Sequence, residues 1–302
     1  MKHPSALHTA SALANAPVSI AVPDAASSAW QASLRLGFAR SHGASRLVER
    51  GHIGPLRFQK PLYPEGPEVC HGIVVHPPGG VVGGDQLSIT ASVAQDAAAL
   101  LTTPGAAKWY RANGRTSRQR IDLEVGSGAS LEWLPQETIF FDDACVDLEQ
   151  SVDLAPDAQY IGLEILCFGR TASGESYTRG RVRQETRIRR GGKLLWHERG
   201  VLVGGSAAMI SPLGMAGKTV CATLVACGRV LPASLLAELR EDMAAHAGEN
   251  AWFGATQMKS VLVARYLGDA SETARMLMTR CWMRIRPALL GREACVPRIW
   301  NT

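Results

Sequence analysis

Polar and apolar residues alternate along most of the chain from residue 30 to about residue 230. In the segment DQLSITASV the apolar residues at every second position are Leu87, Ile89, Ala91 and Val93. The same period of two recurs in WQASLRLGFAR, RQRIDLEV, ASLEWL, ACVDLEQSVDL and GRVRQETRIRR. Successive side chains of a strand point to opposite faces, so this pattern predicts a layered body of half-buried β-strands. The glycine-bearing links at residues 126–128 and 190–192 predict hairpin turns.

Late in the chain the apolar spacing changes from that of strands to that of helices. The segment SLLAELREDMAAHAG predicts a helix with Ser234 as its N-cap and Gly248 as its stop. The segment SETARMLMTRCWMRIR predicts a second helix, capped by Ser271 and ended by Pro287. No repeat of fixed length is visible along the chain.

Composition describes an ordinary globular chain of 302 residues, 46% hydrophobic and 20% charged. The net charge of +5 is a small difference between 32 basic and 27 acidic residues, so it does not imply nucleic-acid binding. Every apolar run is interrupted before the roughly 18 to 20 residues that a membrane helix needs. Seven cysteines without a CxxC pair argue against a disulfide framework and favour a reducing compartment.

The first 28 residues differ in composition from the rest of the chain. Residues 1–28 are rich in Ala, Ser and Pro and contain no solid apolar block, so we expect a disordered tail and not a secretory signal. Residues 29–302 are expected to form a single domain, with a β body to about residue 230 and a helical portion over about residues 232–287.

The glycine-rich segment HPPGGVVGGDQL at residues 76–87 invites a phosphate-binding interpretation, which its spacing does not support. No Lys-Ser or Lys-Thr pair follows these glycines, the GxGxxG spacing is absent, and a strand pattern follows where a helix would be required. We expect tight turns that let backbones approach closely, with Asp85 as a turn-capping or interior acid. GxSxG and HExxH are also absent, which argues against these hydrolase classes.

Three potential metal ligands, Cys70, His71 and His76, lie close together in sequence. No fourth ligand follows at a recognisable spacing, and the alternative is that they are strand residues facing opposite sides. Several acids also lie among apolar residues. These acids are Glu132, Glu137, Asp142, Asp143 and Glu164. A buried carboxylate must either pair with a cation, for which Arg170 and Arg179 are available, or line a polar cavity. A solvent-facing position on an edge strand is the third possibility.

Two basic segments suggest a polyanion as an alternative partner. Residues 108–120 combine basic side chains with Trp109 and Tyr110, although the strand pattern that follows favours one exposed hairpin end. Residues 181–189 place charges at every second position, which predicts a solvated or partner-facing stripe on one strand face. A basic polyanion-binding β module is therefore the alternative function.

Five segments together resemble the urease accessory protein UreD family, called UreH in some systems. They are HPPGGVVGGDQL, TTPGAAKWYR, LEWLPQETIFF, GLEILCFGRTASGE and PRIWNT, in this order. The resemblance implies a non-catalytic urease maturation chaperone, built as a β-helix-like scaffold of stacked strands with about two late helices. It also implies that the protein works in the cytoplasm and binds apo-urease and a UreF-type accessory protein, with a UreG-type GTPase joining through UreF. No nucleic acid or membrane is expected as a partner.

The resemblance further implies that nickel passes through the protein without a tightly bound cofactor. A hydrated cation in transit needs oxygen ligands that are frequent but labile, as in ion conduction. The acids expected to line such a route by their match to the family segments are Asp85, Glu137, Asp142, Glu164 and Glu175. The basic residues expected to shape it are Lys108, Arg111 and Arg170.

Overall fold

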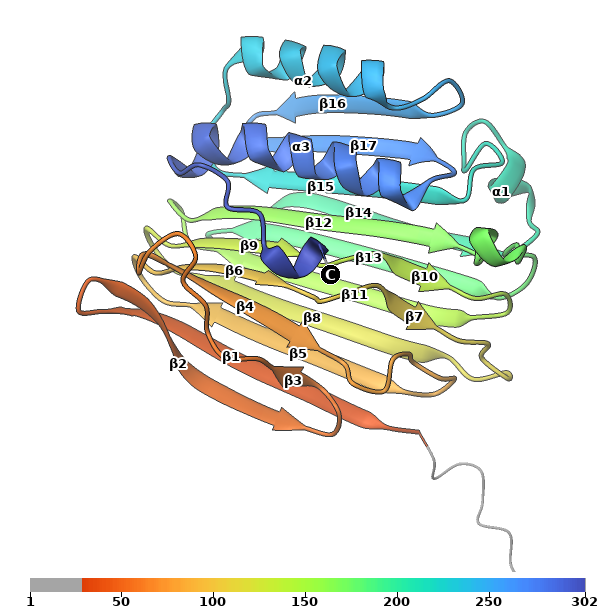
Figure 1. Ribbon diagram of the computed structural model, residues 1–302, viewed down its shortest axis with the longest axis horizontal. Coiled ribbons are helices and arrows are strands. Elements are labelled where there is room, and N and C mark those ends of the chain that lie inside the picture. Colours follow the sequence, from red (N-terminus) through yellow and green to blue (C-terminus); the bar gives the residue numbers. More distant parts are fainter. Residues whose placement is uncertain (1–28, 302) are drawn as a thin grey trace, which may run out of the picture.

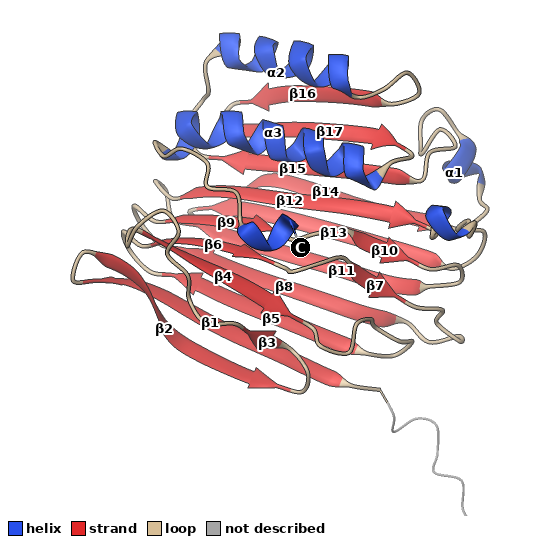
Figure 2. Cartoon of the chain, in the orientation of Figure 1, coloured by secondary structure: helices blue, strands red, loops and turns tan. Residues whose placement is uncertain are grey.

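Two β-sheets face each other in the computed structural model, which describes residues 29–301 (Figure 1). The expected tail at residues 1–28 lies outside the described residues. Two long helices lie against the outer face of the larger sheet, and strands dominate the rest of the chain (Figure 2). The expectation of a mainly β scaffold with late helices is therefore confirmed.

The strands divide between a seven-stranded and a ten-stranded sheet. The seven-stranded sheet has the order β14 (Lys193–Val203), β13 (Arg181–Arg190), β11 (Cys145–Leu154), β8 (Ser117–Val125), β5 (Gln86–Val93), β1 (Gln31–Ser41) and β2 (Ala44–Ile53). The ten-stranded sheet has the order β16 (Trp252–Met258), β17 (Val261–Gly268), β15 (Val220–Cys227), β12 (Gln159–Phe168), β9 (Ser130–Leu134), β6 (Ala98–Thr102), β4 (Val69–Val75) and β3 (Arg57–Phe58). Two short strands complete it beside β12, namely β10 (Thr138–Phe140) and β7 (Ala107–Trp109).

The central strands are parallel because the chain passes back and forth between the two sheets. From β4 to β13 it visits the sheets alternately, and strands of successive turns pair in register. Val69, Ala98, Ser130 and Gln159 lie side by side in this way, at steps of 29, 32 and 29 residues. The result is a β-solenoid of about four turns, as the β-helix-like expectation required.

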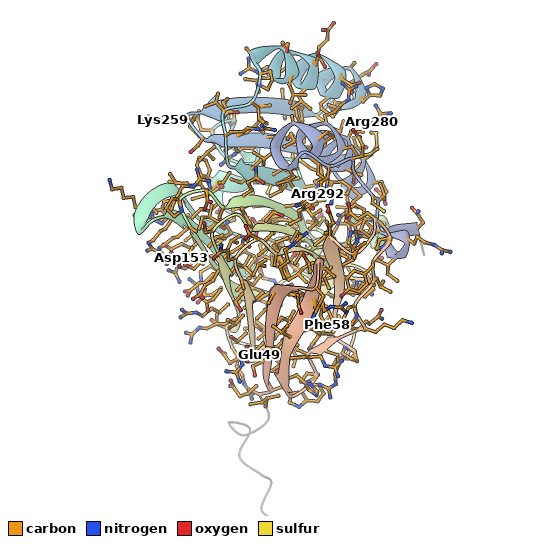
Figure 3. The ribbon with its side chains drawn as sticks, turned by 90° about the vertical axis from the view of Figure 1, so that its left-hand side faces the viewer. Glu49, Phe58, Asp153, Lys259, Arg280 and Arg292 are labelled. Atoms are coloured by element: carbon orange, nitrogen blue, oxygen red, sulfur yellow. The ribbon has the colours of Figure 1, made fainter. Side chains whose placement is uncertain are left out.

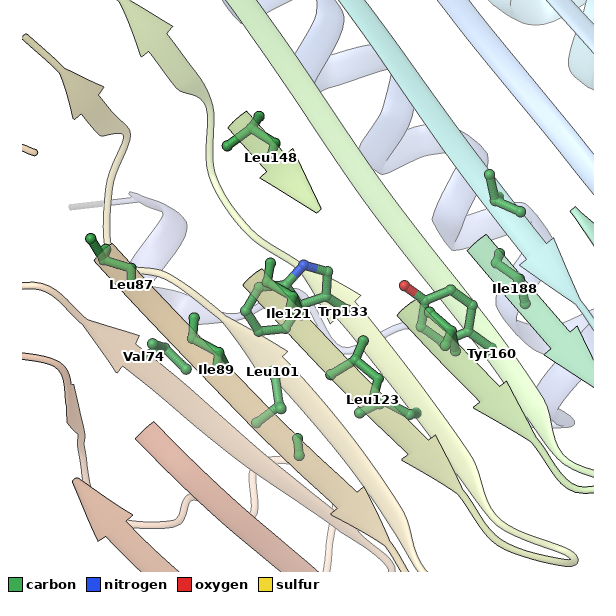
Figure 4. Close-up of a cluster of buried hydrophobic side chains, with 14 of the residues drawn as sticks. Val74, Leu87, Ile89, Leu101, Ile121, Leu123, Trp133, Leu148, Tyr160 and Ile188 are labelled. Carbon is green, nitrogen blue, oxygen red and sulfur yellow. The ribbon is translucent and has the colours of Figure 1, made fainter. Parts of the chain in front are cut away.

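The main core fills the space between the sheets with the alternating apolar residues that the sequence pattern predicted. Leu87, Ile89, Ala91 and Val93 of β5 all face it (Figure 4). The link at residues 126–128 is not the hairpin that its glycines suggested, because it leads from β8 to β9 in the other sheet. Residues 191–192 do form a hairpin between β13 and β14.

A second core lies under the helices on the outer face of the ten-stranded sheet. Helix α2 (Ala233–His246) has Pro232 at its N-cap in place of the predicted Ser234, and Gly248 has the left-handed backbone expected after its end. Helix α3 (Ser271–Leu290) has Ala270 at its N-cap in place of the predicted Ser271, and it continues for three residues past Pro287, where the sequence predicted its end. One short helix, α1 (Ala207–Ile210), and two 3₁₀ turns, Thr171–Ser173 and Arg298–Asn301, complete the fold.

The glycine-rich segment at residues 76–87 forms the tight turns that the sequence predicted. A Cβ atom on Gly83 would lie 1.9 Å from the carbonyl oxygen of Ala112, so only glycine fits there. The buried Asp85 carboxylate accepts the backbone N–H groups of Val82 at 3.1 Å and Trp30 at 2.9 Å. Asp85 is thus both an interior acid and a turn cap.

Candidate functional site

The ten-stranded sheet is interrupted at the same place in successive turns. Strand β9 pairs with β12 as far as Trp133 and Gly162, and β10 resumes the pairing at Thr138 and Leu166. The intervening β12 residues 163–165 have no paired strand on this side among the described residues. This break frees the inner face of β12 from close packing.

Proline-bearing segments produce this interruption. Residues 76–80, 103–106 and 135–137 occupy corresponding positions in three turns, between a first strand and the resumed pairing beyond it. Each segment contains at least one proline, which has no N–H to give to a ladder of strands. The prolines of the family-like segments therefore leave a gap in the sheet.

Three cavities lie in a row between the sheets beside this gap, and we call them the cavity row. The first, of about 190 Å³, has Lys108 and His76 in its lining, and the second, of about 80 Å³, shares Thr103 and Gln119 with it. The third, of about 30 Å³, shares Glu164 with the second. Adjacent cavities have walls in common, so the row runs across the turns of the solenoid.

Glu164 is the carboxylate in the middle of the cavity row. It alternates along β12 with residues of the outer core and therefore points between the sheets, toward Gln150, Gln184 and Thr186. It makes no hydrogen bond or ion pair with any other described side chain. Burial, together with the nearby Glu198 carboxylate, raises the pKa of Glu164 to about 7. Glu164 can therefore exchange a proton near neutral pH.

In the lining of each cavity, one residue has a buried nitrogen donor without a protein acceptor among residues 29–301. These donors are Trp109 Nε1 in the first cavity, Gln136 Nε2 in the second and Trp196 Nε1 in the third. Buried donors are almost always hydrogen-bonded, and water satisfies those that protein groups leave over. The row is thus suited to hold water and solutes that accept hydrogen bonds.

Glu198 and Arg265 mark the end of the row at the third cavity. Glu198, on β14, lines this cavity and accepts a hydrogen bond from Arg265 Nη2 of β17 at 2.6 Å. The Arg265 guanidinium also lies over the Trp196 ring, 5.8 Å from its centroid. A cation-stabilised carboxylate therefore closes this end, and sequence reasoning did not single it out.

The other acids expected along the route are engaged elsewhere. The Asp142 carboxylate accepts the backbone N–H groups of Thr178 at 2.7 Å and Arg179 at 3.0 Å. Although burial alone would raise it, these hydrogen bonds lower the pKa of Asp142 to about 2. Glu137 pairs with Arg275 of α3 at 3.0 Å.

Glu175 and the basic residues lie at the surface. Glu175 pairs with Arg170 at 2.9 Å, and the Arg170 guanidinium lies 4.3 Å from the centroid of the Phe141 ring. Lys108 is exposed on β7 at the rim of the first cavity, whereas Arg111 is exposed in the loop after it. The structure thus brings Glu164 and Lys108 to the cavity row and places the other expected residues around it.

The remaining candidates have structural explanations. Cys70 packs in the inner core while His71, on the opposite face of β4, contacts Glu65 at 2.5 Å, as the alternative interpretation required. Among the described residues no group of three or more His, Cys, Asp or Glu side chains is placed to hold a metal ion. Residues 108–120 are not a hairpin end, since they lead from β7 in one sheet to β8 in the other. In the stripe at residues 181–189, the nearly buried Glu185 pairs with Arg183 and Arg187.

A buried ion network fixes α3 to the ten-stranded sheet. Arg286, which is 0% exposed, donates from Nε to both oxygens of Glu132 at 3.0 Å and from Nη2 to Glu65 at 2.7 Å. Trp282 Nε1 donates a further hydrogen bond to Glu132 Oε2 at 2.6 Å. Although burial alone would raise it, the hydrogen bonds from His71 and Arg286 lower the pKa of Glu65 to about 2.

Fold and site together define a β-solenoid scaffold with a polar row of cavities in its interior. The sequence matches the UreD urease accessory protein family over residues 31–301, and the chain belongs to this family. It is therefore an accessory protein of urease maturation and is not itself a catalyst. No helix in residues 29–301 is long and apolar enough to cross a membrane.

Similar proteins cover nearly the whole chain. A urease accessory protein UreD of Janthinobacterium sp. (strain Marseille) is 64% identical over 272 residues, which are 90% of this chain and 92% of the relative. The UreD of Nitrosospira multiformis is 53% identical over 278 residues, which are 92% of this chain and 100% of the relative. The UreD of Azoarcus sp. (strain BH72) is 51% identical over 278 residues, which are 92% of this chain and 96% of the relative.

Proposed function

We propose that this chain conducts nickel ions along the cavity row toward apo-urease. The observation that carries the proposal is the position of Glu164, a carboxylate without a protein partner among the described side chains, at the junction of the second and third cavities. Glu164 is half-buried, and its surroundings disfavour the charged form, so a function in cation binding accounts for this position better than a structural one.

The lining of the row suits a divalent cation in transit. In the second and third cavities the polar groups are mainly carboxylate, amide and hydroxyl groups, whose oxygens bind Ni²⁺ more weakly than thiolates do, whereas His76 and Lys108 line the first cavity. A cation that enters the second cavity displaces the proton of Glu164 to water, and Glu164 takes up a proton from water again when the ion moves on. Because the pKa of Glu164 is about 7, passage is expected to be faster at pH 8 than at pH 6.

In this proposal Glu164 and Glu198 both line the route. Lys108 at the rim of the first cavity limits the number of cations that enter together, because it repels them. Asp85, Glu137 and Asp142 form hydrogen bonds or ion pairs with protein groups, which supports a structural role for these acids around the route.

The same proposal gives the chain its partners. Family membership supports a cytoplasmic complex with apo-urease and a UreF-type accessory protein, with a UreG-type GTPase bound through UreF. Transient nickel is the cargo, and no tightly bound cofactor is required. Binding of polyanions receives little support from the stripe at residues 181–189, since Asp147, Glu149 and Glu185 pair with three of its four arginines.

Replacement of Glu164 tests the route. Glu164→Gln and Glu164→Ala are expected to lower the nickel content of urease matured in cells that co-express the accessory proteins, whereas Glu164→Asp retains a carboxylate and most of the nickel. Glu175→Gln is the matched control, because Glu175 is an acid outside the row. Metal analysis of purified urease gives the result, and a pull-down of the accessory complex shows that each variant still assembles. Normal nickel content with Glu164→Gln and Glu164→Ala would overturn the proposal.

A further inference from the structure

The outer edge of the seven-stranded sheet has no covering strand. β14 (Lys193–Val203) is 11 residues long and pairs with β13 on one side only. Within residues 29–301 no other strand hydrogen-bonds to its outer side. A row of free backbone groups of this length is enough to accept an added strand.

The ten-stranded sheet extends beyond this edge and exposes part of its inner face. In β16, Phe253 and Ala255 pack under α2, whereas the residues that alternate with them are all exposed. These residues are Trp252, Gly254, Thr256 and Met258. Viewed along the strands, the region around Lys259 rises beyond the edge of the seven-stranded sheet (Figure 3). Two large apolar side chains, Trp252 at 55% and Met258 at 43%, remain open to solvent there.

The free edge of β14 and the bare face of β16 form one surface, which we call the open corner. Arg265 joins its two sides, because it lies on β17 next to β16 and pairs with Glu198 of β14. Lys193 and Lys259 make the corner basic, because both are exposed and form no ion pair among the described residues. Arg199 is also exposed and unpaired there, but it alternates with the cavity-facing Glu198 and therefore lies on the outer face of β14. The third cavity ends at the same place, at Glu198.

We propose that the open corner binds an extended, acidic segment of a partner protein, which adds to β14 as a further strand. One face of such a strand would cover Trp252 and Met258, and its carboxylates would lie beside the free cations of the corner. The basic charge of the corner disfavours a second copy of this chain, since two copies would bring like charges together. The proposal uses the proposed function only to choose the proteins that serve as probes.

Introduction of acidic side chains on the bare face tests the proposal. The double variant Trp252→Glu and Met258→Glu changes exposed side chains only. Val48→Glu is the control, because Val48 is exposed on β2, at the edge of the seven-stranded sheet opposite to β14. Binding of full-length protein to purified apo-urease and, separately, to the UreF-type protein is measured by interferometry. We expect the double variant to weaken binding to one of these proteins at least roughly tenfold and the control to leave it unchanged.

Hydrogen exchange distinguishes strand addition from a side-chain contact. Backbone amides on the outer side of β14 are expected to exchange at least roughly tenfold more slowly in the complex, while those of the edge strand β2 remain unchanged. Unchanged binding to both proteins, unchanged exchange in β14, or concentration-dependent dimers that the double variant abolishes would each overturn the proposal. The two proposals can fail separately. Glu164→Gln can lower the nickel content of urease while it still binds both proteins normally, and the double variant at the open corner tests binding alone.

Discussion

Replacement of Arg286 by methionine measures how much the buried ion network under α3 contributes to the free energy of unfolding. Methionine keeps much of the length and apolar volume of arginine but leaves Glu132 with Trp282 as its only remaining donor. Glu132 is 1% exposed, so water cannot replace the guanidinium. Removing one partner of a buried ion pair typically costs about 3–5 kcal/mol.

Protonation of Glu132 limits this cost. Burial is the largest influence on the pKa of Glu132 and raises it above its ordinary value of 4.5, and the loss of Arg286 removes the main opposing influence. Taking up the proton at pH 7 requires about 3.4 kcal/mol, because about 2.5 pH units separate pH 7 from that value. The folded variant then holds a proton that the unfolded chain releases. Its stability therefore falls as the pH rises above about 5, by about 1.4 kcal/mol per unit, until the raised pKa is reached.

Urea unfolding of Arg286→Met and of the native protein between pH 5.5 and pH 8 measures the effect. The matched control is Arg284→Met, since Arg284 lies on the same helix and makes only exposed pairs with Glu238 and Asp242. We expect the control to cost less than about 1 kcal/mol at every pH. A cost for Arg286→Met that equals the control, or that does not grow with pH, would refute the reasoning.

Two further predictions concern positions at the ends of strands. Asp142→Asn is expected to cost about 1–2 kcal/mol at pH 7, because the carboxylate accepts two backbone N–H groups. The pKa of Asp142 is lowered to about 2, so the native protein should lose this advantage as the pH falls from about 4 to 2, and chemical unfolding at pH 2.5 and 7 checks the sign. Gly83→Ala should lower the melting temperature by several degrees, because its Cβ would meet the Ala112 carbonyl oxygen at 1.9 Å. Gly105→Ala has no atom within 4 Å of the new Cβ, and equal melting temperatures for both variants in calorimetry would contradict the steric explanation.

The strands and their buried faces could be predicted from local sequence, because burial on one face imposes a period of two. Leu87 and Ile89 illustrate this directly. The turns of the solenoid could not be predicted in the same way, since parallel pairing in register leaves no repeated letters. The link at residues 126–128 was misinterpreted for this reason: its glycines fit a hairpin as well as a corner between sheets.

For the candidate site, sequence reasoning found single acids but not their surroundings. Glu164 was identified because a carboxylate interrupts an apolar strand, and this local signal survives in the structure. Glu198 was missed because its β14 segment, KLLWHERGVLV, does not alternate between polar and apolar residues, so nothing in the pattern distinguishes an inward acid from an outward one. Glu132 was noticed, but its partner Arg286 lies 154 residues later and on a helix, where charged residues are ordinary.

The buried network also sets an order of events during synthesis. Glu65 and Arg286 are 221 residues apart, so at about 5–20 residues per second the ribosome adds Arg286 roughly 10 to 40 s after Glu65. During this interval the first solenoid turns can already stack, but the apolar residues Val69 and Leu100 on the outer face lack the helix that covers them. The nascent chain therefore exposes this apolar face until its last tenth is made, and the final helix is the step that covers it.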